Sequence, residues 1–248
     1  MRAENSFIPV EGVGETTERR LWADGVHTWD DFDGEVPGPA PADRVWSFID
    51  RARDRLAAGD PGFFADRFPS GEQWRFYENF REQACFLDIE TTGLDRDRDR
   101  VTVVSLHRAG STTTLVRDRG LSREELAAHF ENAGLLVTFN GKRFDVPFLE
   151  SSFDLDIDHP HFDLIYPCRG LGLTGGLKRI EREVGIDRDR PDLSGRDAVR
   201  LWHEYGRGDE DALETLVSYN RDDTVNLARL AESVTDRLHA EVFEPAVE

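Results

Sequence analysis

The feature that most limits the fold of this chain is an apolar run that carries two carboxylates. Residues 84–94 read A-C-F-L-D-I-E-T-T-G-L, and side chains along a β-strand alternate between its two faces. Asp88 and Glu90 therefore share one face, about 6.6 Å apart along the strand, while Leu87 and Ile89 point the other way. A D-x-E pair on a strand edge is more often solvated surface, but the apolar residues before this pair predict a buried strand that ends in two like charges.

A second group of polar residues interrupts the apolar stripe of a long helix predicted over residues 211–239. Steps of three and four residues place one set of side chains on the inward stripe: Leu213, Leu216, Val217, Asn220, Asp223, Leu227, Leu230 and Val234. Asp223 therefore faces inward, whereas Asp222 faces outward. Tyr219 lies one helical turn before Asp223 and can reach the same point. A polar seam or a helix-capping aspartate is the alternative, but it leaves Asn220 and Tyr219 unexplained.

A third carboxylate follows a strand that ends at an Asn140–Gly141 turn. A helix is predicted directly after this turn, with Asp145 in its first turn. A carboxylate at a helix start is commonly a response to the helix dipole. Phe144 and Phe148 anchor this helix inward on either side of Asp145, so we expect the Asp145 side chain to border the core.

The segments F-L-D-I-E-T-T-G-L, N-G-K-R-F-D and Y-N-R-D-D resemble the three exonuclease motifs of the DnaQ-like, or DEDD, branch of the ribonuclease H-like superfamily, in its tyrosine-containing form. The subgroup that the chain resembles most is the YprB-like ribonuclease H-like domain family, over about residues 82–238. The resemblance implies four metal-binding carboxylates, namely Asp88, Glu90, Asp145 and Asp223. It implies that Tyr219 positions the attacking water. It also implies a substrate-binding set for the terminal nucleotide, to which we assign Thr91, Thr92, Gly93 and Asn140.

The chemistry of four converging carboxylates gives its own reason to expect cations, because partly desolvated like charges are costly without counter-ions. All-oxygen ligands favour Mg²⁺ or Mn²⁺, and two such ions can stabilise both oxygens of an in-line displacement at a phosphodiester. We therefore expect an enzyme, a 3′-5′ exonuclease acting on DNA or RNA, whose polarity and exo-action are implied by the resemblance. The alternatives are a structure-selective endonuclease on the same core, or a catalytically silent nucleic-acid-binding or scaffold protein.

The second part of the chain, residues 81–248, is expected to be an α/β domain with the mixed five-stranded sheet of the ribonuclease H-like fold, flanked by helices. Strands are predicted over residues 84–89, 101–108, 111–117 and 135–139. Helices are predicted over residues 122–132, 144–151, 175–184, 195–205 and 211–239.

The first part, residues 1–80, is expected to be a small helical unit. Residues 33–43 are rich in Pro and Gly and predict a loop or linker, and a helix is predicted from Pro41 to Gly59. The aromatic segment over residues 63–80 is expected to pack as core rather than to form a base-stacking platform. Residues 8–29 resemble a degenerate helix-hairpin-helix, for which a DNA contact and a structural remnant are equally favoured; it tilts the expected substrate weakly toward DNA.

Composition limits the mode of nucleic-acid binding. Among 248 residues, 50 acidic and 31 basic side chains give a formal net charge of −19, which argues against a broad basic face. Only Lys142 and Lys178 are lysines, so the other 29 basic residues are arginines. Together with the many aspartates, this pattern favours a halophilic protein over an ordinary acidic protein from a GC-rich genome.

Cys85 and Cys168 lack metal-ligand spacing. Without a leader or an apolar span of about 20 residues, we expect a cytoplasmic protein; protein partners are unknown.

Overall fold

The structure is a computed structural model that describes residues 1–247. It divides into two compact units. The first comprises Met1–Arg81, Tyr166–Gly172 and Glu232–Glu248, and the second comprises Glu82–Ile165 and Leu173–Ala231. The division at residue 80 that we propose from the sequence places all of the C-terminal residues in the second part, whereas two of these stretches join the first compact unit.

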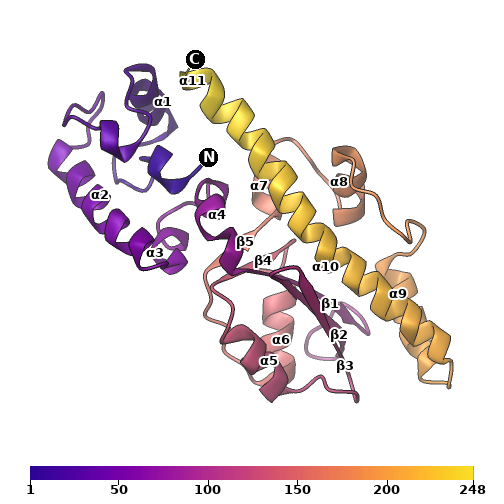
Figure 1. Cartoon of the computed structure of the whole chain (residues 1–248). Coiled ribbons are helices and arrows are strands. Elements are labelled where there is room, and N and C mark those ends of the chain that lie inside the picture. Colours follow the sequence, from indigo (N-terminus) through magenta and orange to yellow (C-terminus); the bar gives the residue numbers. More distant parts are fainter. Residues whose placement is uncertain (248) are drawn as a thin grey trace. The chain divides into compact units, whose positions relative to one another are not determined.

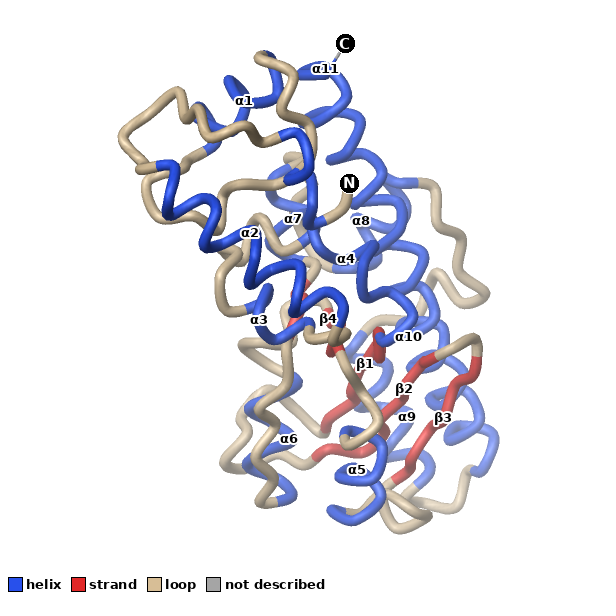
Figure 2. Tube along the Cα trace, turned by 60° about the vertical axis from the view of Figure 1, so that its left-hand side comes forward, coloured by secondary structure: helices blue, strands red, loops and turns tan. Residues whose placement is uncertain are grey.

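The second unit contains a mixed five-stranded sheet in the order β3-β2-β1-β4-β5 (Figures 1 and 2). β1 (Ala84–Thr91), β2 (Val101–Arg108) and β3 (Ser111–Val116) pair antiparallel. β4 (Leu135–Thr138) runs parallel to β1, and β5 (His161–Asp163) runs parallel to β4. The predicted mixed α/β sheet is therefore confirmed.

Helices cover both faces of this sheet (Figure 2). They are α5 (Arg123–Phe130), α6 (Asp145–Phe153), α8 (Leu177–Val184), α9 (Gly195–Tyr205) and the first part of α10 (Glu210–Leu238). On one face, Leu87 and Ile89 of β1 pack in a core cluster with Phe130 of α5 and Phe148 of α6. On the other face, a second cluster joins β2 to α9 and α10, and it contains Val103, Leu201, Leu216 and Tyr219.

Asp88 and Glu90 lie in the part of β1 that extends beyond its pairing with β4. Its parallel pairing with β4 reaches only Phe86 opposite Val137, so the residues after Phe86 have no strand partner on that edge. Its pairing with β2 continues to Thr91, with a register irregularity between Glu90 and Thr91. The alternation predicted from sequence is confirmed, because Leu87 and Ile89 lie in the core shared with α5 and α6. The end of β1 is therefore unpaired along its edge next to β4, and its acidic side chains lie on the face opposite Leu87 and Ile89.

Local turn and cap chemistry agrees with the sequence at several points. Ala109 and Gly110, which join β2 to β3, both have positive φ angles, of 49° and 75°, as a tight hairpin turn requires. The Ser122 hydroxyl caps α5 by accepting the Glu125 backbone N–H at 3.2 Å. Two short elements, β5 and α7 (Ile165–Gly170), were not among the predicted segments.

The first unit is helical. It contains α1 (Glu15–Ala23), α2 (Ala42–Ala57), α3 (Pro61–Ala65) and α4 (Trp74–Phe80), together with the end of α10 and the short α11 (Glu244–Val247). Most aromatic side chains of residues 63–80 are buried, and several contact each other; the Phe64 ring lies 5.4 Å from Phe80 between centroids. These rings form a core, as expected, and not an exposed stacking platform.

An ion pair is buried within this first unit. Arg75 and Glu18 lie 2.6 Å apart, and their side chains are 2% and 1% exposed. The Glu18 carboxylate also accepts the Ser6 hydroxyl at 2.6 Å and the Phe7 backbone N–H at 2.7 Å, while burial raises its pKa. The Ile8 backbone N–H, which belongs to the helix-hairpin-helix-like segment, also donates to this carboxylate at 3.3 Å. A contact of this segment with DNA stays a prediction.

Candidate active site

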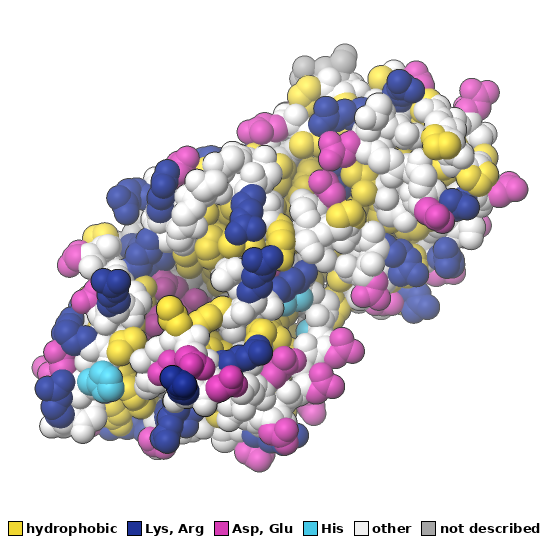
Figure 3. Space-filling model, turned by 180° about the vertical axis from the view of Figure 1, so that it is seen from behind, with side chains coloured by type: hydrophobic (Ala, Val, Ile, Leu, Met, Phe, Trp, Pro, Cys, Tyr) yellow, Lys and Arg dark blue, Asp and Glu magenta, His cyan; other side chains and the backbone are white. Residues whose placement is uncertain are grey.

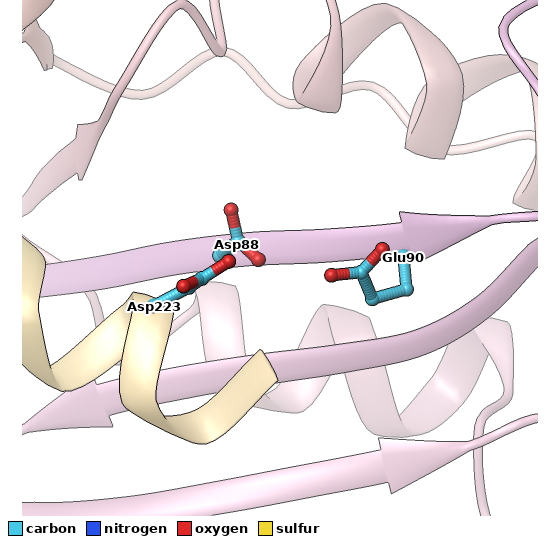
Figure 4. A group of neighbouring side chains, drawn as sticks. All are labelled: Asp88, Glu90 and Asp223. Atoms are coloured by element: carbon cyan, nitrogen blue, oxygen red, sulfur yellow. The ribbon is translucent and has the colours of Figure 1, made fainter. Parts of the chain in front are cut away.

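Three carboxylates meet where β1 and α10 face each other (Figure 4). One oxygen atom from each of Asp88, Glu90 and Asp223 lies within 4.8 Å of the other two. Glu90 and Asp223 are buried, and Asp88 is partly buried. The strand alternation supplies the first two residues and the helical stripe supplies the third, so the structure brings together three of the four carboxylates predicted from the sequence.

Asp145, the fourth predicted carboxylate, lies in the first turn of α6 and is buried. Its oxygens are not part of the three-residue group, but its charge raises the pKa values of Asp88 and Glu90. Burial raises the pKa of Asp145 itself to about 7, although a hydrogen bond with the Ile89 backbone opposes the shift. Asp145 therefore borders the group and belongs to the same electrostatic site.

The acidic residues disfavour one another's ionisation. The pKa values of Asp88 and Glu90 lie well above the usual range, first because of burial and then because of the charges of Asp223 and Asp145. Asn220 donates a hydrogen bond of 2.7 Å to Oδ2 of Asp88, which favours the ionised form. A set of oxygen donors that can ionise together only with added positive charge fits a hard divalent cation.

The sequence did not indicate a place in this site for three charged residues, namely Arg188, Glu181 and Lys178. The Arg188 guanidinium donates to both Glu181 and Asp223. The side chains of Arg188, Glu181 and Asp223 are buried. The Lys178 ammonium lies 4.3 Å from the centroid of the Tyr219 ring. Burial raises the pKa of Asp223 to about 6, although Arg188 opposes the shift. One signal points to Lys178: a chain that otherwise uses arginine has only two lysines.

Tyr219 lies beside the carboxylates on α10. Its ring is buried in the cluster that includes Val103 and Leu216. Burial raises the pKa of its phenol, and the charges of Asp223, Glu90 and Asp88 raise the pKa further. The phenol therefore stays protonated and can donate a hydrogen bond, which suits it to orient a water molecule rather than to deprotonate one.

A cavity of about 750 Å³ opens beside Glu90. It is lined by Ile89, Glu90, Thr91, Gly93, Leu94, Phe144, Ser194, Gly195, Arg196 and Val199. Two of the predicted substrate residues, Thr91 and Gly93, therefore face it. The Thr92 hydroxyl is hydrogen-bonded to the Asp99 carboxylate at 3.1 Å. A Cβ atom at Gly93 would collide with this same carboxylate, so a side chain there would displace Asp99 from its contact with Thr92.

Asn140, the other predicted substrate residue, lies in the turn between β4 and α6 with a left-handed φ of 65°. Its backbone N–H donates to Oδ1 of Asp163 at 2.6 Å, and the Lys142 N–H donates to Oδ2 at 3.1 Å. Asp163 of β5 therefore fixes the turn that leads into Asp145. A substrate contact by the Asn140 side chain stays a prediction.

The family model of the ribonuclease H superfamily matches residues 85–235 of this chain. The chain belongs to the ribonuclease H superfamily. The matched segment runs from β1 to α10, so it contains all four carboxylates and Tyr219. The predicted ribonuclease H-like fold is thereby confirmed.

The chain is also similar to several solved structures. One is the apo form of a nuclease, with 24% identity over 66% of this chain and 77% of that chain and a TM-score of 0.47. Another is the family B DNA polymerase from the hyperthermophilic archaeon Pyrobaculum calidifontis, with 16% identity over 62% and 24% of the two chains and a TM-score of 0.48. A third is Brucella melitensis NrnC bound to pGG, with 21% identity over 69% and 81% and a TM-score of 0.44. No curated protein matches this chain.

Proposed function

We propose that this chain is a metal-dependent 3′-5′ exonuclease that hydrolyses phosphodiester bonds of DNA or RNA. The observation that carries the proposal is the meeting of Asp88, Glu90 and Asp223 within 4.8 Å, in a chain of the ribonuclease H superfamily. The position of Tyr219 one turn before Asp223 supports the tyrosine-containing DEDD type. The motif resemblance supports the YprB-like subgroup and the 3′-5′ polarity.

The carboxylates Asp88, Glu90, Asp145 and Asp223 would hold two ions, Mg²⁺ or Mn²⁺. Two ions held there would supply an activated water and would stabilise the leaving oxygen of the broken P–O bond. Asn220 holds the Asp88 carboxylate in one orientation through its 2.7 Å hydrogen bond. Tyr219 orients the attacking water with its protonated phenol.

The cavity beside Glu90 suits the terminal nucleotide. Its walls include the apolar side chains of Leu94, Phe144 and Val199, against which a base can pack. Thr91 and Gly93 lie on the same cavity, between the base site and the carboxylates. Thr92 and Asn140 would act from the adjoining loops. The helix-hairpin-helix resemblance favours DNA weakly over RNA.

The surface gives the substrate little electrostatic attraction. On the face that Figure 3 shows, Lys and Arg side chains are interspersed with Asp and Glu side chains rather than gathered into one basic patch. The net charge is −19, so long-range repulsion of a nucleic acid is expected at low ionic strength.

No helix within residues 1–247 has the length and hydropathy to cross a membrane. We propose a cytoplasmic enzyme of a salt-loving cell, active at molar KCl.

The proposal is tested by incubating the full chain with end-labelled single- and double-stranded DNA and RNA in molar KCl, with Mn²⁺ or Mg²⁺. Stepwise release of mononucleotides from the 3′ end is expected, with folded Asp88→Asn as the inactive control. Cutting of a circular single strand would instead indicate an endonuclease. Equal absence of turnover in wild type and Asp88→Asn would indicate a binding protein.

A further inference from the structure

The guanidinium of Arg188 binds two carboxylates. One of them, Asp223, is a proposed metal ligand, and the other, Glu181, is not. Arg188 lies in the segment after α8, and its Nε and one terminal nitrogen donate to Glu181 and Asp223. Its side chain is only 5% exposed. The same Asp223 contributes an oxygen to the three-carboxylate group with Asp88 and Glu90. A divalent cation and Arg188 therefore offer positive charge to the same carboxylate.

The pairing leaves part of the guanidinium unused. The second terminal nitrogen of Arg188 is buried and has no hydrogen-bond partner among the described residues. The Lys178 ammonium, next to the Tyr219 ring, is likewise buried without a hydrogen-bond partner there. A buried charged donor without an acceptor is costly. Both cations therefore have donor capacity that no acceptor of the described residues uses, and an anion could take it up.

The formal charges of the site indicate which anion this is. Five carboxylates, namely Asp88, Glu90, Asp145, Glu181 and Asp223, lie with two cationic groups, Lys178 and Arg188, so three negative charges are uncompensated. Two divalent ions would leave one positive charge in excess. A phosphodiester carries one negative charge and presents oxygens that match the fork of a guanidinium.

We propose that Arg188 is an internal counter-ion which a divalent cation displaces from Asp223, and that the displaced guanidinium then binds a phosphate group of the nucleic acid. Glu181 keeps one end of the guanidinium in place during the exchange, because it lies on α8 and outside the three-carboxylate group. Arg188 thus sets the metal affinity in the empty site and contacts substrate in the loaded site. The inference rests on the proposed function, since it requires metal at Asp223.

The first measurement is isothermal titration calorimetry of Mn²⁺ into the full chain in molar KCl. Because a competitor reduces the apparent affinity in proportion to the fraction of sites that it leaves free, Arg188→Gln should bind Mn²⁺ roughly tenfold or more tightly than wild type. Lys178→Gln is the matched control: it also removes a positive charge near Asp223 and Glu90, but the Lys178 ammonium makes no hydrogen bond to either carboxylate. It should change the affinity by less than about threefold.

The second measurement is binding of thymidine 5′-monophosphate. At saturating Mn²⁺, Arg188→Gln should lose about tenfold in affinity for this probe, while wild type without metal should bind it weakly because Arg188 is engaged. Circular dichroism with and without Mn²⁺ monitors folding, and Arg188→Lys serves as a second variant that keeps the charge but not the fork; it should give intermediate affinities for both ligands.

The outcomes separate the two proposals. Absence of Mn²⁺ binding to wild type would overturn the proposed function itself. Binding to wild type with an unchanged or weaker affinity in Arg188→Gln would overturn only the competition by Arg188. Tighter Mn²⁺ binding in Arg188→Gln with unchanged nucleotide affinity would overturn the transfer of Arg188 to phosphate.

Discussion

The side-chain amide of Asn220 donates a 2.7 Å hydrogen bond to Oδ2 of Asp88, across 132 positions of the sequence. Asn220 is fully buried, and no donor among the described residues reaches its Oδ1. This contact ties α10 to β1 directly at the carboxylates. It also orients an acidic side chain whose neighbours repel it, which is the usual task of an outer-shell hydrogen bond at a metal site.

Removal of this amide should cost activity more than stability. We expect Asn220→Ala to reduce kcat/KM by about 10–100-fold, because outer-shell partners of metal ligands have effects of this size. The control is Asn226→Ala, which removes another buried amide of α10, one that pairs with Arg229. An equal loss of activity in both variants would assign the effect to helix packing.

Removal of the Tyr219 hydroxyl should slow the chemical step. Tyr219→Phe keeps the ring in its cluster with Val103 but deletes the group that orients water, so kcat should fall by roughly 10²-fold. Calorimetry should show an unchanged Mn²⁺ affinity. Tyr205→Phe, on α9 near Arg119, should retain full activity; if Tyr219→Phe does too, the hydroxyl has no part in catalysis.

Stability without metal should depend on pH through Asp145. Burial raises the pKa of Asp145 to about 7 in the folded chain, so the folded state binds more protons than the unfolded state between about pH 4 and 7. Stability is therefore lost as the pH rises through this window. Urea unfolding in EDTA should show Asp145→Asn gaining about 2–3 kcal/mol on wild type between pH 5 and pH 8. Saturating Mn²⁺ at pH 8 should reverse the order, and a pH-independent difference would contradict this assignment.

The turn before α6 should not tolerate a side chain at Gly141. A Cβ atom there would collide with the Thr138 side chain, whose hydroxyl accepts the Gly141 N–H at 3.1 Å. We expect Gly141→Ala to destabilise the chain by about 1–3 kcal/mol in urea unfolding. Gly71→Ala is the control, because a Cβ at Gly71 meets no atom within 4 Å.

The buried ion pair of the first unit should be intolerant of the loss of one partner. Arg75→Met leaves the Glu18 carboxylate buried without its cation, which costs about 3–5 kcal/mol. Arg53→Met breaks an exposed pair with Asp30 and should cost at most about 1 kcal/mol. Urea midpoints of the two variants compare these losses, and similar values would show that burial does not decide them.

Periodicity predicted the parts of the site that lie on regular elements. The two-residue period of β1 placed Asp88 and Glu90 on one face, and the helical period of α10 selected Asp223 over Asp222. These inferences need only the local repeat of each element. β5 has three residues, which is too short for any period to show, so that strand was not predicted from its own sequence.

The sequence could not predict contacts that depend on tertiary placement. Arg188 bonds to Asp223 across 35 positions and to Glu181 across 7, and its segment has no repeat that indicates a direction. The place of Asp145 beside the three-carboxylate group, rather than within it, depends on the turn that Asp163 holds. Such geometry follows from several loops acting together, which no local pattern encodes.

α10 contributes residues to both compact units, since its residues up to Ala231 belong to the second unit and those from Glu232 belong to the first. The Phe243 ring lies against Trp22 of α1, with centroids 5.1 Å apart and planes at 86°. The packing around Trp22 therefore needs a residue that is synthesised much later. Co-translational folding of the N-terminal helices should stay unfinished until Phe243 has been synthesised, and a stop codon shortly before Glu232 should expose the Trp22 surface to chaperones and proteases.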